Sequence, residues 1–242
     1  MERLRDCHRY GEDDGPFCTM LSDAYRCHTD IIALPNRLFY GNRLVSLAPA
    51  VHANALLDWD ALPRCGVPLV FHDVEGVSTT GGAAGHSFTN AAEAAAVAQW
   101  VDALLSAKRA AASEIGIIAP YAAQVRALEL LLLEKFGPAR AAAIKVGSVE
   151  QFQGEERKVV IITTTRGDND ASLGFVSDPR RANVMMTRAI ALLIVVGSAV
   201  ALEQRQALPG ETEGDGGGSA WATFVQEQRV RGTVVSAAPN VV

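Results

Sequence analysis

Apolar and polar positions alternate in blocks along this chain, and the blocks predict strands and helices in turn. Short continuous apolar runs indicate strands buried on both faces, and longer stretches with apolar residues three or four apart indicate helices. The strand-like runs are 67–72, 115–119, 144–149, 158–165 and 191–196, and the helix-like stretches are 30–40, 121–136, 178–189 and an alanine-rich segment after Asn90. This alternation predicts an α/β fold, a parallel sheet with helices on both faces.

Turn and cap residues mark where several of these elements begin and end. Asn90, followed by Glu93 three positions later, resembles a capping box at the start of the alanine-rich helix. Gly137 and Pro138 close the leucine-rich helix, because glycine permits the left-handed conformation common at helix ends. The Gly, Ser and Thr residues of 76–87 predict an exposed loop.

The chain has 242 residues, which is long enough for one sizeable domain, and we find no internal repeat. Residues 1–20 are charged and irregular. We expect the domain to occupy residues 21–206. The remainder, 207–242, predicts a glycine-rich linker and a last helix with Trp221 and Phe224.

Composition narrows the class of protein without naming it. Hydrophobic residues make up 49% of the chain and charged residues 20%, so a packed core is expected rather than disorder. The net charge of −5 argues against a broadly basic surface, so any polyanion must be held by local Arg or Lys clusters. No apolar run approaches the roughly 20 residues that cross a bilayer, so no membrane partner is expected.

The four cysteines, Cys7, Cys18, Cys27 and Cys65, form no C-x-x-C pair. Two of them precede a histidine, but their intervals do not fit a compact zinc module, and we expect no metal site in this chain. Free thiols without a signal peptide are typical of a reducing compartment, so we expect a cytoplasmic protein.

Three polar segments stand out, because ligands of open parallel sheets bind beyond the carboxyl ends of the strands. The first is Tyr25-Arg26-Cys27-His28. An Arg beside an aromatic ring can pair with phosphate while the ring stacks on a base. The same four residues also suit a surface Arg next to a partly buried Tyr.

The second segment is GSVEQFQGEER, residues 147–157, between two apolar strands. Its glycines permit close backbone approach, and its Ser, Gln and Glu side chains can bond hydroxyl or phosphate oxygens. The simpler alternative is a polar crossover loop.

The third segment is DPRRANVMMTR, residues 178–188, directly before the last apolar strand. Arg181 and Arg188 are seven positions apart, so on one continuous helix they would share a face. An Arg at the end of that helix has the arrangement of an arginine finger, which stabilises charge on a transferring phosphoryl group. The alternative is a solvated basic helix end.

Together these segments resemble motifs IV, V and VI of the second motor domain of up-frameshift-like superfamily-1B helicases, and they look most similar to the Armitage-type RNA helicases linked to small-RNA silencing. YRCH resembles motif IV, GSVEQFQGEER motif V and RANVMMTRA motif VI. Segments such as DIIALPNRLFYGNRL and LGFVSDPRRANV add to the match, which covers about residues 20–200. The resemblance implies a RecA-like domain of the P-loop NTPase type.

The resemblance also implies roles for single residues around an ATP site between two RecA-like domains. Arg26 and Arg188 would contact the γ-phosphate and stabilise its transition state. Tyr25 would lie against the nucleotide. The remaining implied positions are Gln153, Gly154 and Glu156 at the ribose or in coupling ATP to domain closure, and Pro120, Tyr121, Ser148 and Thr164 at the RNA backbone.

The sequence contains no G-x-x-x-x-G-K-[ST] segment and no Asp-Glu pair ending a buried strand. The implied cofactor, ATP with Mg²⁺, would therefore take its phosphate loop and metal ligands from a first motor domain. We expect this chain alone not to hydrolyse ATP, whether it is a fragment, a truncated gene model or a degenerate relative. The implied partners are single-stranded RNA or an RNA duplex, the N-terminal RecA-like domain, and proteins of silencing or RNA decay.

A parallel α/β sheet of this kind also allows two other functions. A non-catalytic module that grips nucleic acid or a partner would need the same surface but no ATP hydrolysis. A nucleotide-binding oxidoreductase would need a glycine fingerprint after an early strand, and Gly81-Gly82 and residues 216–218 lack that context.

Overall fold

The computed structural model describes residues 19–81, 87–170, 172–204 and 219–239. Its centre is a six-stranded sheet with the order β10-β3-β9-β8-β6-β7, in which all neighbouring strands are parallel. The strands are β3 (Leu69–Asp73), β6 (Ile115–Ile118), β7 (Lys145–Gly147), β8 (Arg157–Thr163), β9 (Ala189–Gly197) and β10 (Val234–Val235). The predicted parallel α/β sheet is confirmed.

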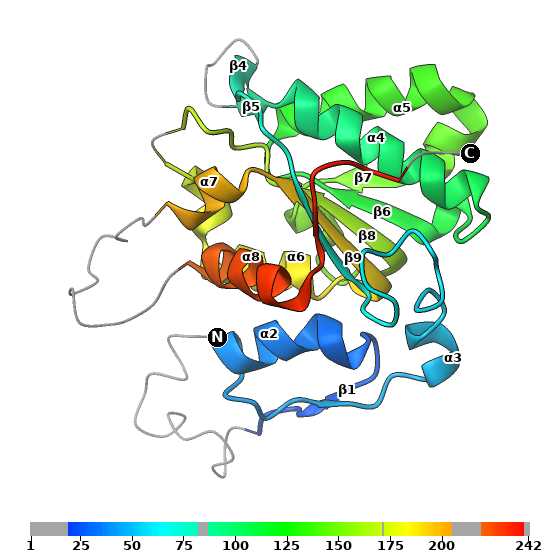
Figure 1. Cartoon of the computed structure of the whole chain (residues 1–242), viewed down its shortest axis with the longest axis vertical. Helices are drawn as coiled ribbons and strands as arrows, with labels where there is room; N and C mark the ends of the chain where they lie inside the picture. Colours follow the sequence, from blue (N-terminus) through cyan, green and yellow to red (C-terminus); the bar gives the residue numbers. More distant parts are fainter. Residues whose placement is uncertain (1–18, 82–86, 171, 205–218, 240–242) are drawn as a thin grey trace.

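Helices cover both faces of this sheet (Figure 1). One face packs against α4 (Ala91–Ser106) and α5 (Ala122–Ala143). The other packs against α2 (Thr29–Phe39), α6 (Pro179–Met186), α7 (Ala199–Glu203) and α8 (Ala220–Arg231). Side chains alternate along each strand, so on β8 Val159 and Ile161 face α4 and α5 while Val160 and Ile162 face the other layer. This is why the strands read as continuous apolar runs.

Shorter elements flank this core. A two-stranded parallel ribbon joins β1 (Asp23–Ala24) to β2 (Val45–Ser46), next to α2. The remaining helical pieces are α3 (Ala50–Ala53) and the 3₁₀ turns η1 (Ala112–Glu114), η2 (Glu150–Phe152) and η3 (Gly174–Ser177).

The predicted loop at 76–87 is wrong where its residues form strands, and residues 82–86 of it lie outside the described residues. β4 (Thr79–Gly81) and β5 (Ser87–Thr89) pair as antiparallel strands. Phe88 of β5 also contacts the domain, because its ring packs edge-on against Tyr121 with ring centroids 5.2 Å apart. Sequence pattern alone could not show that contact.

The chain after residue 218 packs on the same sheet. Trp221 and Phe224 of the predicted last helix are buried in the core beside the sheet, and β10 pairs with β3 at the edge. The glycine-rich run up to residue 218 lies outside the described residues, as do residues 1–18 with Cys7 and Cys18. α8 and β10 are therefore part of the packed domain.

The predicted start of α4 matches the structure, whereas the predicted ends of α5 and α6 differ from it. Asn90 accepts the backbone N–H of Glu93 at the start of α4, as a cap should. Gly137 breaks α5 with a φ of 76°, but the helix resumes and continues to Ala143. α6 ends at Met186, earlier than the sequence predicted, because Ala189 already belongs to β9.

Candidate functional site

A pocket of about 430 Å³ lies at the amino ends of β8 and β9, beside the β1–β2 ribbon. Glu156 directly precedes β8, and Arg188 directly precedes β9. The pocket is lined by Asp23, Ala24, Tyr25, Arg26, Cys27, Ile32, Tyr40, Leu44, Glu156, Thr187 and Arg188. The structure thus brings together Tyr25, Arg26, Glu156 and Arg188, which come from three separate segments of the sequence.

The segment before α2 reaches this pocket through the backbone. The N–H of His28 donates to the carbonyl of Ile190 at 2.9 Å, which places Arg26 beside the start of β9. The His28 ring caps α2 by accepting the N–H of Asp30. Cys27 is buried, and burial raises the pKa of its thiol to about 11. Cys27 is therefore a protonated packing residue at neutral pH.

Arg26 is held by two partners in the pocket. Its Nε donates to Glu156 Oε2 at 2.5 Å, and its Nη1 donates to the Thr187 carbonyl at 3.3 Å. Both side chains remain partly exposed, at 31% for Arg26 and 51% for Glu156. Glu156 is thus a rim carboxylate that an incoming anion could displace from Arg26.

All three nitrogens of the Arg188 guanidinium donate hydrogen bonds within the protein. Its Nε, Nη1 and Nη2 donate to Val184 O at 3.0 Å, Glu155 O at 3.4 Å and Thr187 Oγ1 at 3.0 Å. Burial, with the nearby charge of Arg26 adding to it, lowers the pKa of Arg188 from its usual value. A guanidinium fixed in this way is already oriented before any ligand arrives.

Two further pocket residues carry contacts that sequence reasoning missed. Thr187 holds both arginines, one through its carbonyl and the other through its hydroxyl, which itself donates to Asn183 O at 2.8 Å. The Tyr40 hydroxyl accepts from Asn183 Nδ2 at 2.8 Å, joining α2 to α6. The signal for Thr187 was its place beside Arg188, whereas nothing local marked Tyr40.

The predicted nucleotide set is only partly assembled. Tyr25 is 65% exposed at the pocket mouth, and its hydroxyl donates to Asp23 Oδ2 at 3.3 Å. Gln153 and Gly154 are exposed in the turn before β8 and do not line the pocket. Gly154 has a φ of 83°, which only glycine adopts readily, so its freedom serves the turn.

The predicted pairing of Arg181 with Arg188 on one helix face is wrong. Because α6 ends at Met186, Arg188 lies beyond the helix. Arg181 contacts a different surface, pairing with Glu150 at 3.0 Å and covering the ring of Phe175.

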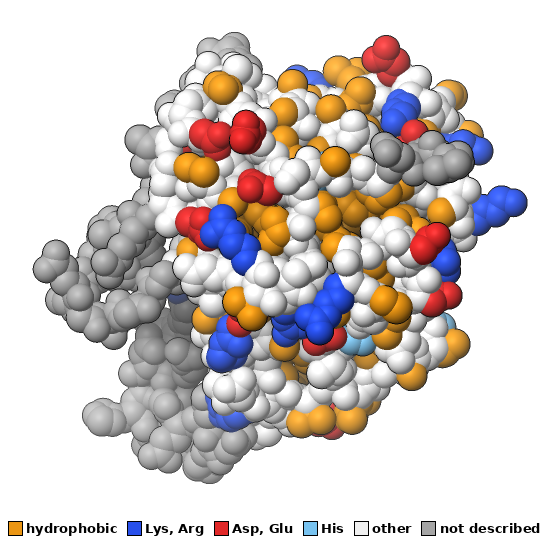
Figure 2. Space-filling view, in the orientation of Figure 1, with side chains coloured by type: hydrophobic (Ala, Val, Ile, Leu, Met, Phe, Trp, Pro, Cys, Tyr) orange, Lys and Arg blue, Asp and Glu red, His pale blue; other side chains and the backbone are white. Residues whose placement is uncertain are grey.

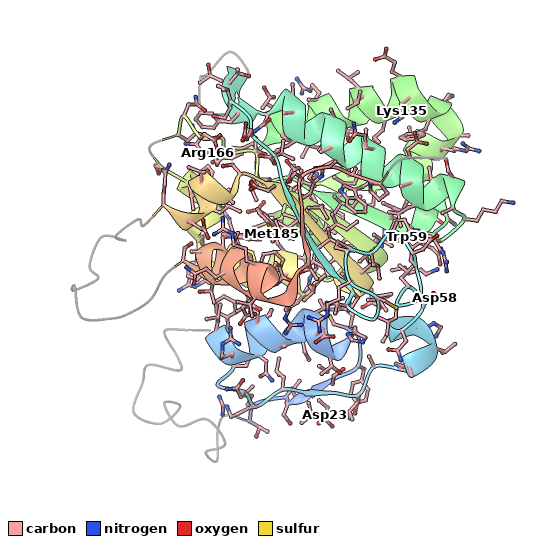
Figure 3. All side chains as sticks on the ribbon, viewed as in Figure 1. Asp23, Asp58, Trp59, Lys135, Arg166 and Met185 are labelled. Carbon is pink, nitrogen blue, oxygen red and sulfur yellow. The ribbon has the colours of Figure 1, made fainter. Side chains whose placement is uncertain are left out.

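The residues assigned to RNA lie at the opposite edge of the sheet. Pro120 and Tyr121 follow β6, Ser148 follows β7 and Thr164 follows β8. Figure 3 shows the separation, with Asp23 of the pocket at the bottom of the view and Arg166, just after β8, at the upper left. The expectation that all three polar segments sit at carboxyl ends is therefore wrong for the arginine pocket.

Burial limits which of these four residues can meet a ligand. Ser148 and Pro120 are partly exposed. Tyr121 is 4% exposed, and its hydroxyl donates to the carbonyl of Leu173 at 3.4 Å. Thr164 is 1% exposed beneath the surface, with its hydroxyl 3.4 Å from Glu93 Oε1. Thr164 is thus a buried residue in this structure.

On the face drawn in Figure 2, neither positive nor negative charge dominates, because basic and acidic side chains are interspersed. This agrees with the net charge of −5. Among the described residues, no helix combines the length and apolar character needed to span a bilayer.

Comparison with known proteins places the chain in a family. A family model described as an AAA domain matches residues 1–200, and the chain belongs to that family. Within it, the chain is a relative of the Mov10-type helicases of the up-frameshift-like superfamily 1, as its motifs indicated. It is 40% identical over 208 residues to the putative helicase MOV-10 of Gallus gallus, covering 78% of this chain and 21% of that protein.

One further relative and one solved structure extend the comparison. RNA helicase Mov10l1 of Homo sapiens is 38% identical over 216 residues, covering 82% of this chain and 17% of that protein. The C-terminal domain of a possible DNA helicase from Lactobacillus plantarum has a TM-score of 0.41 at 15% identity, covering 72% of this chain and 87% of that one. The chain spans about a fifth of the length of the curated relatives it matches.

Proposed function

We propose that this chain is the second motor domain of an ATP-driven RNA helicase, and that Arg26 and Arg188 act on the γ-phosphate of ATP bound to a first motor domain. The single observation that carries the proposal is that both guanidiniums line one open pocket beside an exposed Tyr25 ring. The two guanidiniums can bind phosphate oxygens of a nucleotide, and the aromatic ring can stack on its base.

The residues present fit ATP better than they fit its metal ion. Arg26 and Arg188 would hold terminal phosphate oxygens, and Arg188 would act as the arginine finger because its orientation is already fixed. Glu156 would exchange its bond to Arg26 for one to a ribose hydroxyl, which would link nucleotide binding to the position of Arg26. Bound Mg²⁺ would neutralise phosphate charge, with its ligands supplied by the first motor domain.

RNA as the substrate is proposed because the human relative is named an RNA helicase. A sequence-independent grip on the strand would suit a motor that steps over any base. Roles in silencing or RNA decay, and a cytoplasmic location, are proposed on the same family resemblance.

The test uses a two-domain protein in which a first motor domain from a Mov10-type relative precedes this chain. Arg188→Ala should lower the RNA-stimulated ATPase rate about 10³-fold or more, since an arginine finger contributes that much where it operates. Arg229→Ala is the control, because Arg229 is a partly exposed arginine on α8 that does not line the arginine pocket and pairs instead with Glu203 of α7. An Arg188→Ala protein that keeps its rate would remove the finger role.

The chain by itself should show no RNA-stimulated ATP hydrolysis, because its 242 residues hold no phosphate-loop segment. Hydrolysis by the pure chain would contradict the proposal. That same absence favours a second candidate, a non-catalytic module that binds nucleic acid. Failure of the two-domain protein to hydrolyse ATP, with RNA binding retained, would favour that module.

A further inference from the structure

Phe175 is a large apolar residue at the surface, in a turn whose neighbouring residues are buried. It is 54% exposed, although it lies in η3 between Leu173 and Val176, which are both buried. The Trp221 indole N–H donates to the Val176 carbonyl at 2.8 Å, and the Tyr121 hydroxyl donates to the Leu173 carbonyl at 3.4 Å. The backbone on both sides of the ring is therefore anchored in the core, and the ring is held in solvent.

A guanidinium and a second aromatic ring lie beside the Phe175 ring. The Arg181 guanidinium carbon lies 4.7 Å from the ring centroid of Phe175, and the Tyr121 ring centroid lies 6.1 Å away at a tilt of 50°. Arg181 is in turn fixed by its pair with Glu150 at 3.0 Å. The Phe175 ring is thus held in place on the protein by these neighbours, so its exposed part needs no rearrangement to accept another ring.

The location suits a nucleic-acid strand. Tyr121 follows β6, and Glu150 lies in η2 just after β7, so Phe175 sits over the carboxyl ends of these two strands. Partly exposed Pro120 and Ser148 lie at the same edge. This edge is away from the arginine pocket at the amino ends of β8 and β9.

We propose that Phe175, backed by the guanidinium of Arg181, is a stacking platform for one unpaired base of a single-stranded nucleic acid. The inference rests on the proposed function, which supplies the strand, and adds a residue outside the segments assigned to RNA. Every base has a flat π-face, so the platform would accept any base. Because Glu150 neutralises Arg181, stacking rather than phosphate attraction would dominate, and this contact would depend weakly on salt.

The test compares two fluorescent oligonucleotides of equal length, oligouridine RNA and a strand with the same backbone but abasic positions. Fluorescence anisotropy would measure the affinity of each for the 242-residue chain and its variants. Base–aromatic stacking corresponds to an affinity difference of roughly 5- to 150-fold. Phe175→Ala should weaken oligouridine binding by that factor and leave abasic binding unchanged.

Two conservative variants separate stacking from general apolar contact. Phe175→Trp keeps a flat ring and should retain oligouridine affinity, whereas Phe175→Leu keeps apolar surface without a ring and should behave like Phe175→Ala. Leu130→Ala is the control, since Leu130 is 61% exposed on α5. Circular dichroism would verify that every variant is folded.

The outcomes distinguish the two proposals. If the wild-type chain binds neither strand, the RNA-binding function fails and the platform fails with it. If the wild type binds oligouridine but Phe175→Ala binds it equally well, only the platform is overturned. Equal wild-type affinity for both strands would also overturn the platform, and the exposed Phe175 ring would then be interpreted as a contact for another protein.

Discussion

Arg26 Nε lies 2.5 Å from Glu156 Oε2, although 130 positions separate the two residues in the chain. The contact exists because the segment before α2 hydrogen-bonds to the start of β9, whose neighbour β8 begins directly after Glu156. A phosphate entering the pocket would compete with the Glu156 carboxylate for the same guanidinium.

That competition predicts a gain of anion binding on removal of the carboxylate charge. Glu156→Gln should bind tripolyphosphate up to about fivefold more tightly, because a partly exposed ion pair is worth up to about 1 kcal/mol. Isothermal titration calorimetry on the chain would measure this. Glu155→Gln is the control, since the Glu155 carboxylate pairs with Arg157 outside the pocket. Weaker binding by Glu156→Gln would mean that Glu156 positions Arg26 rather than competing for it.

Thr187 is expected to support the position of both arginines. Thr187→Val keeps the side-chain shape but removes the hydroxyl that accepts from Arg188 and donates to Asn183 O. The free energy of unfolding should fall by about 1–2 kcal/mol, because a hydrogen bond to a charged group is lost. Urea denaturation would measure this, and tripolyphosphate affinity should fall in parallel. Thr187→Ser should recover both quantities, and a Thr187→Ser protein as impaired as Thr187→Val would argue against the hydroxyl.

Glu93 predicts an unusual pH dependence of stability. It is fully buried, and burial raises the pKa of its carboxyl from 4.5 to about 7, against the lowering effect of hydrogen bonds from Thr163 and Thr165. A raised pKa means that the folded chain binds this proton more tightly than the unfolded chain does. The stability contributed by this group is therefore complete below about pH 4.5 and is lost as pH rises toward 7.

The measurement is the free energy of unfolding in urea at pH 5 and pH 7.5, for wild type and Glu93→Gln. The difference between the two proteins should change by about 2 kcal/mol over this interval, in favour of the variant at higher pH. Taking the difference cancels the titration of His28 and His72, whose pKa values burial lowers. Parallel pH profiles for the two proteins would show that Glu93 does not titrate there.

Trp221 tests whether α8 is integral to the domain. The indole is 1% exposed and packs edge-on against Phe224, and its N–H donates to the carbonyl of Val176. Trp221→Ala should lower the free energy of unfolding by about 3–5 kcal/mol, through the lost burial and the cavity left behind. Val230→Ala, at a position 88% exposed on the same helix, should change it by less than about 0.5 kcal/mol. Similar values for both variants would mean that α8 contributes little to the core.

The sequence by itself determined the fold class and the main elements. Apolar runs such as 158–165 and 191–196 can be buried only with both faces covered, which demands a parallel sheet between two helical layers. The cap at Asn90 and the break at Gly137 follow from local backbone chemistry. The motif resemblance likewise depended only on residue order, and the family comparison confirms it.

Only the tertiary structure decided which end of the sheet carries which residues. Arg188 lies beyond α6 and Thr164 is buried beside Glu93, while β4 and β5 pair as strands within a polar stretch. Each of these outcomes depends on contacts between segments far apart in the chain. Local patterns record whether a side chain prefers burial or solvent, but not the neighbour it meets, and that neighbour is set by the packing of the whole domain.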